Sequence, residues 1–171
     1  MHFRKFAPED AQFCFQLRNQ AFTDLFGGQL QPEEVAAAVN AYQLADYIRM
    51  AGKGAFFIVE HRDSRAGFFY LQRIDPATAE LCLIYIDPRF HQRGIGRGCI
   101  GHIDRWVSAN WKKVDTLIVD TVIPGYNALF YQKAGFTPLG QSVCVLSGMP
   151  VKALRLSRRI KSSLETRPEP A

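Results

Sequence analysis

The sequence contains no closely spaced pair of cysteines of the kind that binds a metal ion or performs redox chemistry. Its cysteines, Cys14, Cys82, Cys99 and Cys144, are far apart, and each stands in an apolar context. The four histidines show no metal-ligand spacing either. We therefore expect reduced, buried thiols and no metal site, which is typical of a cytoplasmic protein.

Long apolar runs are missing as well. No stretch approaches the roughly 18 residues of a membrane helix, and the N-terminus does not resemble a signal peptide. The net charge is only +5, from 21 Lys and Arg against 16 Asp and Glu. This charge mildly favours an anionic ligand, but no basic helix or aromatic-basic strand pattern indicates nucleic-acid binding. With no repeat and no low-complexity tract, the 171 residues are expected to form one globular domain.

Apolar periodicity and turn residues predict a mixed α/β chain in the order β-α-α-β-β-β-α-β-α-β-β. The expected strands are residues 2–6, 55–60, 67–74, 81–86, 114–119, 143–146 and 151–156. The expected helices run from Pro8 to Leu25, from Pro32 to Ala51, from Ile95 through Val107, and from Tyr126 to Lys133. Residues 157–171 are basic and carry two late prolines, so we expect a mobile tail after a domain of residues 1–156.

A strand, a glycine-rich turn and a helix follow one another at the centre of the chain. The apolar run Leu81–Ile86 predicts a buried strand that Asp87-Pro88 ends, because proline has no N–H for a strand ladder. The turn that follows holds three alternate glycines, Gly94, Gly96 and Gly98. Three arginines surround them: Arg89, Arg93 and Arg97. Such a turn directs backbone N–H groups and the positive end of a helix dipole at one spot, which favours phosphate binding.

This turn resembles the pyrophosphate loop of the GNAT acyltransferase superfamily. The family pattern is Gln or Arg, two free positions, Gly, one free position, and then Gly or Ala. In this register residues 91–96 read His91-Gln92-Arg93-Gly94-Ile95-Gly96 and agree with the pattern after the first position. His91 departs from the usual first residue. A second register, residues 93–98, also matches, but the first puts Asp87-Pro88 at the usual distance. Further on, residues 130–136 (FYQKAGF) resemble the late helix of the family, with Tyr131 before Lys-x-Gly-Phe.

The resemblance implies a GNAT-like α/β (α+β) domain whose mixed, mostly antiparallel sheet is flanked by helices. It also implies an N-acetyltransferase that uses acetyl-CoA as acyl donor, releases CoA, and lets an amine attack directly in a ternary complex. The strand edge at residues 84–86 would hold the pantetheine arm like an added strand. Family members often carry an Asn seven positions before the tyrosine; here that position is Pro124, and Asn127 is nearby. The expected cofactor-binding residues are Ile84, Tyr85, Ile86, His91, Gln92, Arg93, Gly94, Ile95, Gly96, Arg97 and Asn127.

Two residues are candidates for the chemistry. Glu80 stands eleven positions before residue 91, and histone-type members of the family carry their base glutamate at the matching position. The alternative is that Glu80 is a surface residue at a strand end and that water chains move the proton. Tyr131 could give a proton to the departing thiolate. Its alternative role is that of a packed helix tyrosine.

Two other functions stay open. Residues 96–101 match the dinucleotide fingerprint G-x-G-x-x-G and Asp120 follows at a strand end, so a Rossmann NAD(P)-dependent oxidoreductase is one alternative. A catalytically silent CoA-binding or regulatory module is the other, and it would need neither Glu80 nor Tyr131. The acceptor is not identified by any motif, and the sequence leaves a homodimer open.

Overall fold

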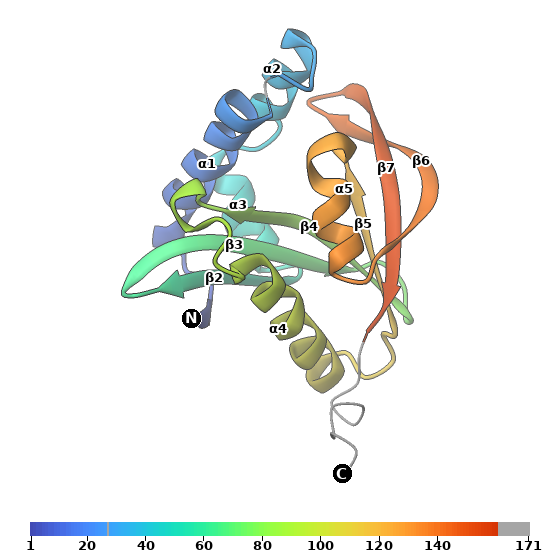
Figure 1. Ribbon diagram of the computed structural model, residues 1–171. Coiled ribbons are helices and arrows are strands. Elements are labelled where there is room, and N and C mark those ends of the chain that lie inside the picture. The colour runs from blue at the N-terminus through green and yellow to red at the C-terminus, as the bar shows by residue number, and fades with distance from the viewer. Residues whose placement is uncertain (27, 161–171) are drawn as a thin grey trace.

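The computed structural model describes residues 1–26 and 28–160 (Figure 1). Within that part of the chain, seven strands form one sheet: β1 His2–Lys5, β2 Ala55–His61, β3 Ser64–Arg73, β4 Thr78–Ile86, β5 Thr116–Thr121, β6 Thr137–Leu146 and β7 Met149–Arg159. The α-helices are α1 Ala11–Gln20, α2 Pro32–Asn40, α3 Leu44–Ala51, α4 Ile95–Asn110 and α5 Pro124–Lys133. Short helical turns occupy Pro8–Asp10, Ala21–Leu25 and Pro88–Phe90.

The strands lie in the order β1-β2-β3-β4-β5-β7-β6. Neighbouring strands are antiparallel except for β4 and β5, which are parallel because α4 connects them as a crossover. Helix α4 covers one face of the sheet, and α1 and α3 cover the opposite face (Figure 1). The predicted mixed, mostly antiparallel sheet flanked by helices is confirmed.

The apolar content of the central strands explains this three-layer arrangement. In β2, Phe57 and Val59 pack towards α4, while Phe56 and Ile58 pack towards α1 and α3. A strand covered on both faces needs a continuous apolar run instead of an alternating one, and residues 55–59 provide it.

One predicted helix is in fact two helices. The segment from Pro32 to Ala51 breaks at residues 41–43, because the Asp46 carboxylate accepts a hydrogen bond from the Gln43 backbone N–H at 2.7 Å and so starts α3. Tyr42, in the break, lies edge-on to Tyr47, with ring centroids 6.1 Å apart. The prediction of a single helix was wrong because periodic apolar residues continue through the break.

The sheet also extends beyond the predicted end of the domain. Strand β7 runs to Arg159, so residues 157–159, which we assigned to a tail, belong to the sheet. Arg158 is 9% exposed and forms an ion pair with Asp104 of α4, which is 8% exposed. Its Nη1 also donates to the Ala134 carbonyl at 2.8 Å. The Ile160 N–H donates to the Asp115 carbonyl at 2.8 Å, and the rest of the predicted tail, residues 161–171, lies outside the described residues.

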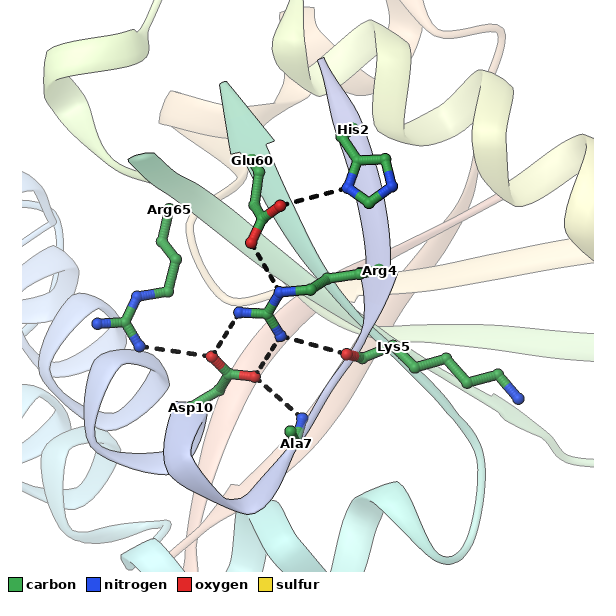
Figure 2. Close-up of polar contacts among 7 residues, drawn as sticks. All are labelled: His2, Arg4, Lys5, Ala7, Asp10, Glu60 and Arg65. Carbon is green, nitrogen blue, oxygen red and sulfur yellow. Dashed lines mark hydrogen bonds and ion pairs between the residues drawn. The ribbon is translucent and has the colours of Figure 1, made fainter. Parts of the chain in front are cut away.

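A network of charged side chains fixes the start of α1 to the first strands (Figure 2). Asp10 is 1% exposed and accepts hydrogen bonds from Arg4 Nη1 and Nη2 at 2.6 and 2.8 Å. Arg4 Nε donates to Glu60 of β2 at 2.7 Å. Burial on its own would raise the pKa of Asp10, but the bonds from Arg4 and from the Ala7 N–H lower it overall. The network therefore sets the position of α1, one wall of the cleft described next.

Candidate functional site

A cleft opens where the two parallel strands separate. Strands β4 and β5 pair only from Thr78 to Glu80, opposite Thr116 to Ile118. Strand β4 then continues to Ile86 and β5 to Thr121. Among the described strands, the β5-facing backbone groups of residues 81–86 therefore have no partner, and polar backbone groups in that state can bind an extended ligand.

The cleft has a volume of about 980 Å³. Its walls come from α1 and the turn after it, from β4, from the loop at residues 90–97, from the ends of β5 and β6, and from α5. Every predicted site residue except Arg93 lines it: Glu80, Ile84, Tyr85, Ile86, His91, Gln92, Gly94, Ile95, Gly96, Arg97, Asn127 and Tyr131. Residues that are far apart in the sequence are thus brought to one cavity.

A β-bulge lies in the wall formed by β4. Tyr70 of β3 pairs with Leu83 and Leu71 pairs with Leu81, so Cys82 is an extra residue without a cross-strand partner. As a result Leu81 packs on the α4 face whereas Leu83 packs on the α1 face, although they are two positions apart. A run of apolar residues gives no signal for such an insertion, and the sequence reading missed it.

The loop before α4 presents free backbone N–H groups. The Gly98 N–H donates to the Gly94 carbonyl at 2.9 Å, so the N–H groups of Ile95, Gly96 and Arg97 come before the first helical hydrogen bond and have no acceptor within the helix. Gly94 precedes the helix with φ of 75°, a left-handed conformation that glycine adopts without steric cost. The arrangement is that of an anion site at a helix N-terminus.

His91 closes this loop onto the strand before it. Its Nε2 lies 2.8 Å from the Ile86 carbonyl, which can only accept, so Nε2 carries the proton and donates. Its backbone N–H donates to the Pro88 carbonyl at 3.1 Å and is therefore already used. The departure at this position is thus explained by a structural role for the ring.

The three arginines around the loop differ in what they contact. The Arg89 guanidinium binds the Asp87 carboxylate, with Nη2 2.7 Å from Oδ2, and is turned to that partner. Arg93 and Arg97 are exposed and form no ion pair with residues 1–26 or 28–160. The Arg93 guanidinium lies 5.9 Å from the Phe90 ring centroid. Two of the three are therefore free to pair with an anion.

Glu80 lies at the point where the strands separate, next to a second carboxylate. Asp120, two residues beyond the Ile118 that pairs with Glu80, accepts from Arg155 Nη2 at 2.6 Å and from Ser142 Oγ at 2.8 Å. Burial, together with the Asp120 charge, raises the pKa of Glu80, although Arg155 opposes the shift. The sequence reading considered Asp120 only as a ribose-binding residue. Its proximity to Glu80 depends on strand register, which no motif reveals.

Tyr131 stands on α5 among aromatic rings and is 5% exposed. The rings of Phe130 and Phe136 lie edge-on to it, with centroids 5.1 and 5.4 Å away. Burial, with a smaller contribution from Tyr85, raises its pKa, so the hydroxyl stays protonated at neutral pH. Asn127, one turn earlier on α5, donates from Nδ2 to Thr121 Oγ1 at 3.0 Å, which leaves its carbonyl oxygen available.

A family model described as the acetyltransferase (GNAT) domain matches residues 52–138, just over half of the chain. The protein belongs to the GNAT family. The matched segment contains β2 to β5, the loop, α4 and α5, and thus all of the predicted site residues. No curated protein matches the sequence.

Solved structures of GNAT proteins share this fold. A GCN5-related N-acetyltransferase from Rhodopseudomonas palustris superposes with a TM-score of 0.79 at 18% identity, covering 92% of this chain and 94% of that one. The PaiA N-acetyltransferase from Thermoplasma acidophilum, in complex with coenzyme A, gives a TM-score of 0.71 at 14% identity, over 92% and 98%. The ribosomal-protein-S18-alanine N-acetyltransferase from Escherichia coli gives 0.67 at 16%, over 97% of each chain.

The topology excludes the Rossmann alternative. That fold requires a mostly parallel sheet, whereas this sheet has one parallel pair. Asp120, its expected ribose ligand, is bound to Arg155. Among the described residues, no helix is long and apolar enough to cross a membrane, and no three His, Cys, Asp or Glu side chains are grouped as a metal site.

Proposed function

We propose that the protein is an N-acetyltransferase that moves an acetyl group from acetyl-CoA to a primary amine in a ternary complex. The observation that carries this proposal is the separation of β4 and β5 at Glu80. It opens an unpaired strand edge that leads directly to the free N–H groups of α4. The reduced cysteines favour a cytoplasmic location.

The cleft would hold the acyl donor along its length. The N–H groups of residues 95–97, with Arg93 and Arg97, would bind the pyrophosphate, and Gln92 and Gly94 shape that turn. The edge of β4 at Ile84, Tyr85 and Ile86 would bind the pantetheine amides as an added strand does. The side-chain amide oxygen of Asn127 on α5 is a further hydrogen-bond acceptor for the donor. Acetyl-CoA supplies the chemistry of a thioester, whose carbonyl carbon accepts the amine while the sulfur leaves.

Two residues would move the protons. The amine nitrogen forms a bond to the acyl carbon and loses a proton, which Glu80 would accept directly or through water. Its raised pKa suits that role, since a base works best when its pKa approaches the working pH. The carbon–sulfur bond breaks and the sulfur keeps the electron pair, to which the protonated Tyr131 hydroxyl would donate.

The test combines binding with turnover. Calorimetry should detect CoA binding but no NAD binding, and Arg97→Ala should weaken the CoA affinity about 5- to 20-fold through loss of a charge-assisted contact. The matched control is Arg105→Ala, which removes an equal charge from an exposed position further along α4. A panel of primary amines with acetyl-CoA, read by thiol release, then tests activity. CoA binding without turnover of any amine would instead indicate a silent CoA-binding module.

A further inference from the structure

A buried arginine that has no counter-ion among the described residues lies in the wall of the cleft. Arg18 of α1 is 2% exposed, and it lines the same cavity as Glu80 and Tyr85. Its Nη1 donates to the Ala38 carbonyl at 2.6 Å. The guanidinium carbon lies 4.8 Å from the Phe22 ring centroid and 4.7 Å from that of Tyr42. Nε is buried and has no hydrogen-bond acceptor within the described chain.

No carboxylate in the described part of the chain neutralises the charge of Arg18. Across residues 1–26 and 28–160, no carboxylate lies within ion-pairing distance of it, and Asp120, which lines the same cleft, is bound to Arg155. Arg158, the other buried arginine, also has an unbonded Nε, but it is paired with Asp104. Aromatic faces and one carbonyl compensate only part of the cost of burying a cation. A buried cation in a cavity wall is therefore a site for an anion that comes from outside.

The position of Arg18 associates it with the acceptor. Glu80 alternates with Ala79 and Leu81, which pack on the α4 face, so Glu80 faces the α1 side of the sheet, as Arg18 does. The free N–H groups of α4 begin on the opposite side. The α1 side of the cleft thus carries an unpaired cation at Arg18, and a carboxylate pair at Glu80 and Asp120 where the strands separate.

We propose that Arg18 binds a carboxylate on the acceptor, so that the substrate class is an amino acid or a similar molecule that carries both an amine and a carboxylate. This rests on the proposed acetyltransferase function and specifies its acceptor. The carboxylate would neutralise Arg18 while the amine faces Glu80, which matches the charge distribution of the cleft. A single-charged carboxylate balances one guanidinium, whereas a phosphate monoester would bring up to two charges. Burial raises the pKa of Tyr42 and of Tyr85, so both phenols stay neutral and able to donate to the same carboxylate.

The test compares each L-amino acid with its own primary amide, which keeps the amine and removes the negative charge. We expect wild-type protein to acetylate at least one amino acid with a kcat/KM some 10- to 100-fold above that of its amide, the range for a charge-assisted hydrogen bond. Arg18→Met should bring this ratio close to one and leave the CoA affinity unchanged. Arg18→Lys, which keeps the charge without the planar fork, should retain part of the preference. Arg105→Met is the matched control and should leave the ratio as in wild type.

Equal use of acids and amides by the wild type, or an unchanged ratio in Arg18→Met, would overturn the proposal while leaving the acetyltransferase function intact. If no amine is acetylated, the proposed function fails, and the same acid–amide pairs are compared for binding by calorimetry. A lack of preference there overturns the role of Arg18 independently. If Arg18→Met does not fold, the acid-to-amide ratios of kcat/KM for wild type and for Arg18→Lys decide whether Arg18 binds the carboxylate.

Discussion

Gly96 lies against the ring of Phe130. A Cβ atom at position 96 would come within 2.7 Å of Phe130 Cε2, closer than real side chains approach one another. The absence of a side chain at Gly96 therefore allows the start of α4 to pack directly against α5. Since Tyr131 follows Phe130, this contact links the position of the anion-binding loop to that of the proposed acid.

Gly96→Ala should lower the free energy of unfolding, and Phe130→Leu in the same chain should relieve part of the loss. We expect a coupling energy of about 0.5–3 kcal/mol in a urea double-mutant cycle, as for residues in contact. Gly94→Ala is the control. A Cβ atom at position 94 would meet no other atom, so this variant should lose only the roughly 1–2 kcal/mol that an alanine costs in the left-handed conformation. Phe130→Leu should not relieve that loss. Additive effects of Gly96→Ala and Phe130→Leu would contradict the packing role.

Tyr131→Phe keeps the ring and removes only the hydroxyl. If the phenol protonates the leaving thiolate, kcat should fall about 10- to 10⁴-fold with little change in the acetyl-CoA KM, measured by steady-state thiol release. The melting temperature of the variant should stay close to that of wild type. A large loss of stability with normal kcat would assign Tyr131 to packing instead.

Glu80→Gln should lower kcat/KM about 10²- to 10⁴-fold at pH 7, because the attacking amine arrives protonated. The loss should shrink towards high pH, where the amine is already neutral. In the wild type, the base form of Glu80 exists above its raised pKa, so activity should increase as pH rises through that value. Asp120→Asn removes a negative charge near Glu80 and frees Arg155. Both changes should lower the pKa of Glu80, so the rise of activity with pH should occur at lower pH.

The pH–activity profiles of wild type, Glu80→Gln and Asp120→Asn decide whether Glu80 acts as the base. A carboxylate that only binds substrate would raise the amine KM equally at every pH when it is removed. Identical profiles for wild type and Glu80→Gln between about pH 6.5 and 9.5 would assign the proton transfer to water or to the substrate.

Arg158→Met should destabilise the fold by about 3–5 kcal/mol, because it leaves the Asp104 carboxylate buried without its partner. The double variant Arg158→Met with Asp104→Leu should recover most of that loss, since an apolar pair has no desolvation cost. Chemical denaturation measures both.

Deleting residues 161–171 is expected from the sequence to change the melting temperature little, whereas a deletion from residue 157 would remove the end of β7 as well. Equal effects of the two deletions would contradict this assignment.

The sequence alone predicted the strands, the loop and the late helix, because these depend on local signals. Continuous apolar runs identify strands buried on both faces, and the alternate glycines Gly94, Gly96 and Gly98 identify the loop. The break at residues 41–43 was missed because the Asp46 cap competes with a helical pattern that continues past it. The end of the sheet was missed because Arg158 and Arg159 look like tail residues until Asp104 is placed beside the first of them.

Local sequence patterns predicted which residues would lie together in the cleft, but they did not reveal the contacts that depend on strand register. The loop residues 91–97 other than Arg93, together with the edge of β4, line the cleft. The pairing of Asp120 with Arg155 next to Glu80, and the isolation of Arg18, arise from contacts between distant segments. In both cases the role of the residue depends on which side chains surround it in the fold, and its own position in the sequence does not reveal them.

The extra residue in β4 makes the length of that strand as important as its composition. If Cys82 took a regular place in the strand ladder, residues 83–86 would exchange faces: Tyr85 would point towards α4, and Ile84 and Ile86 would lie on the α1 side in its place. Deleting Cys82 would only remove the bulge, because Leu81 and Leu83 already lie on opposite faces. The bulge therefore decides which side chains of β4 share the side of the sheet on which Arg18 lies. A single inserted residue between positions 83 and 86, paired in a regular ladder, would turn every later residue of the strand to the other face.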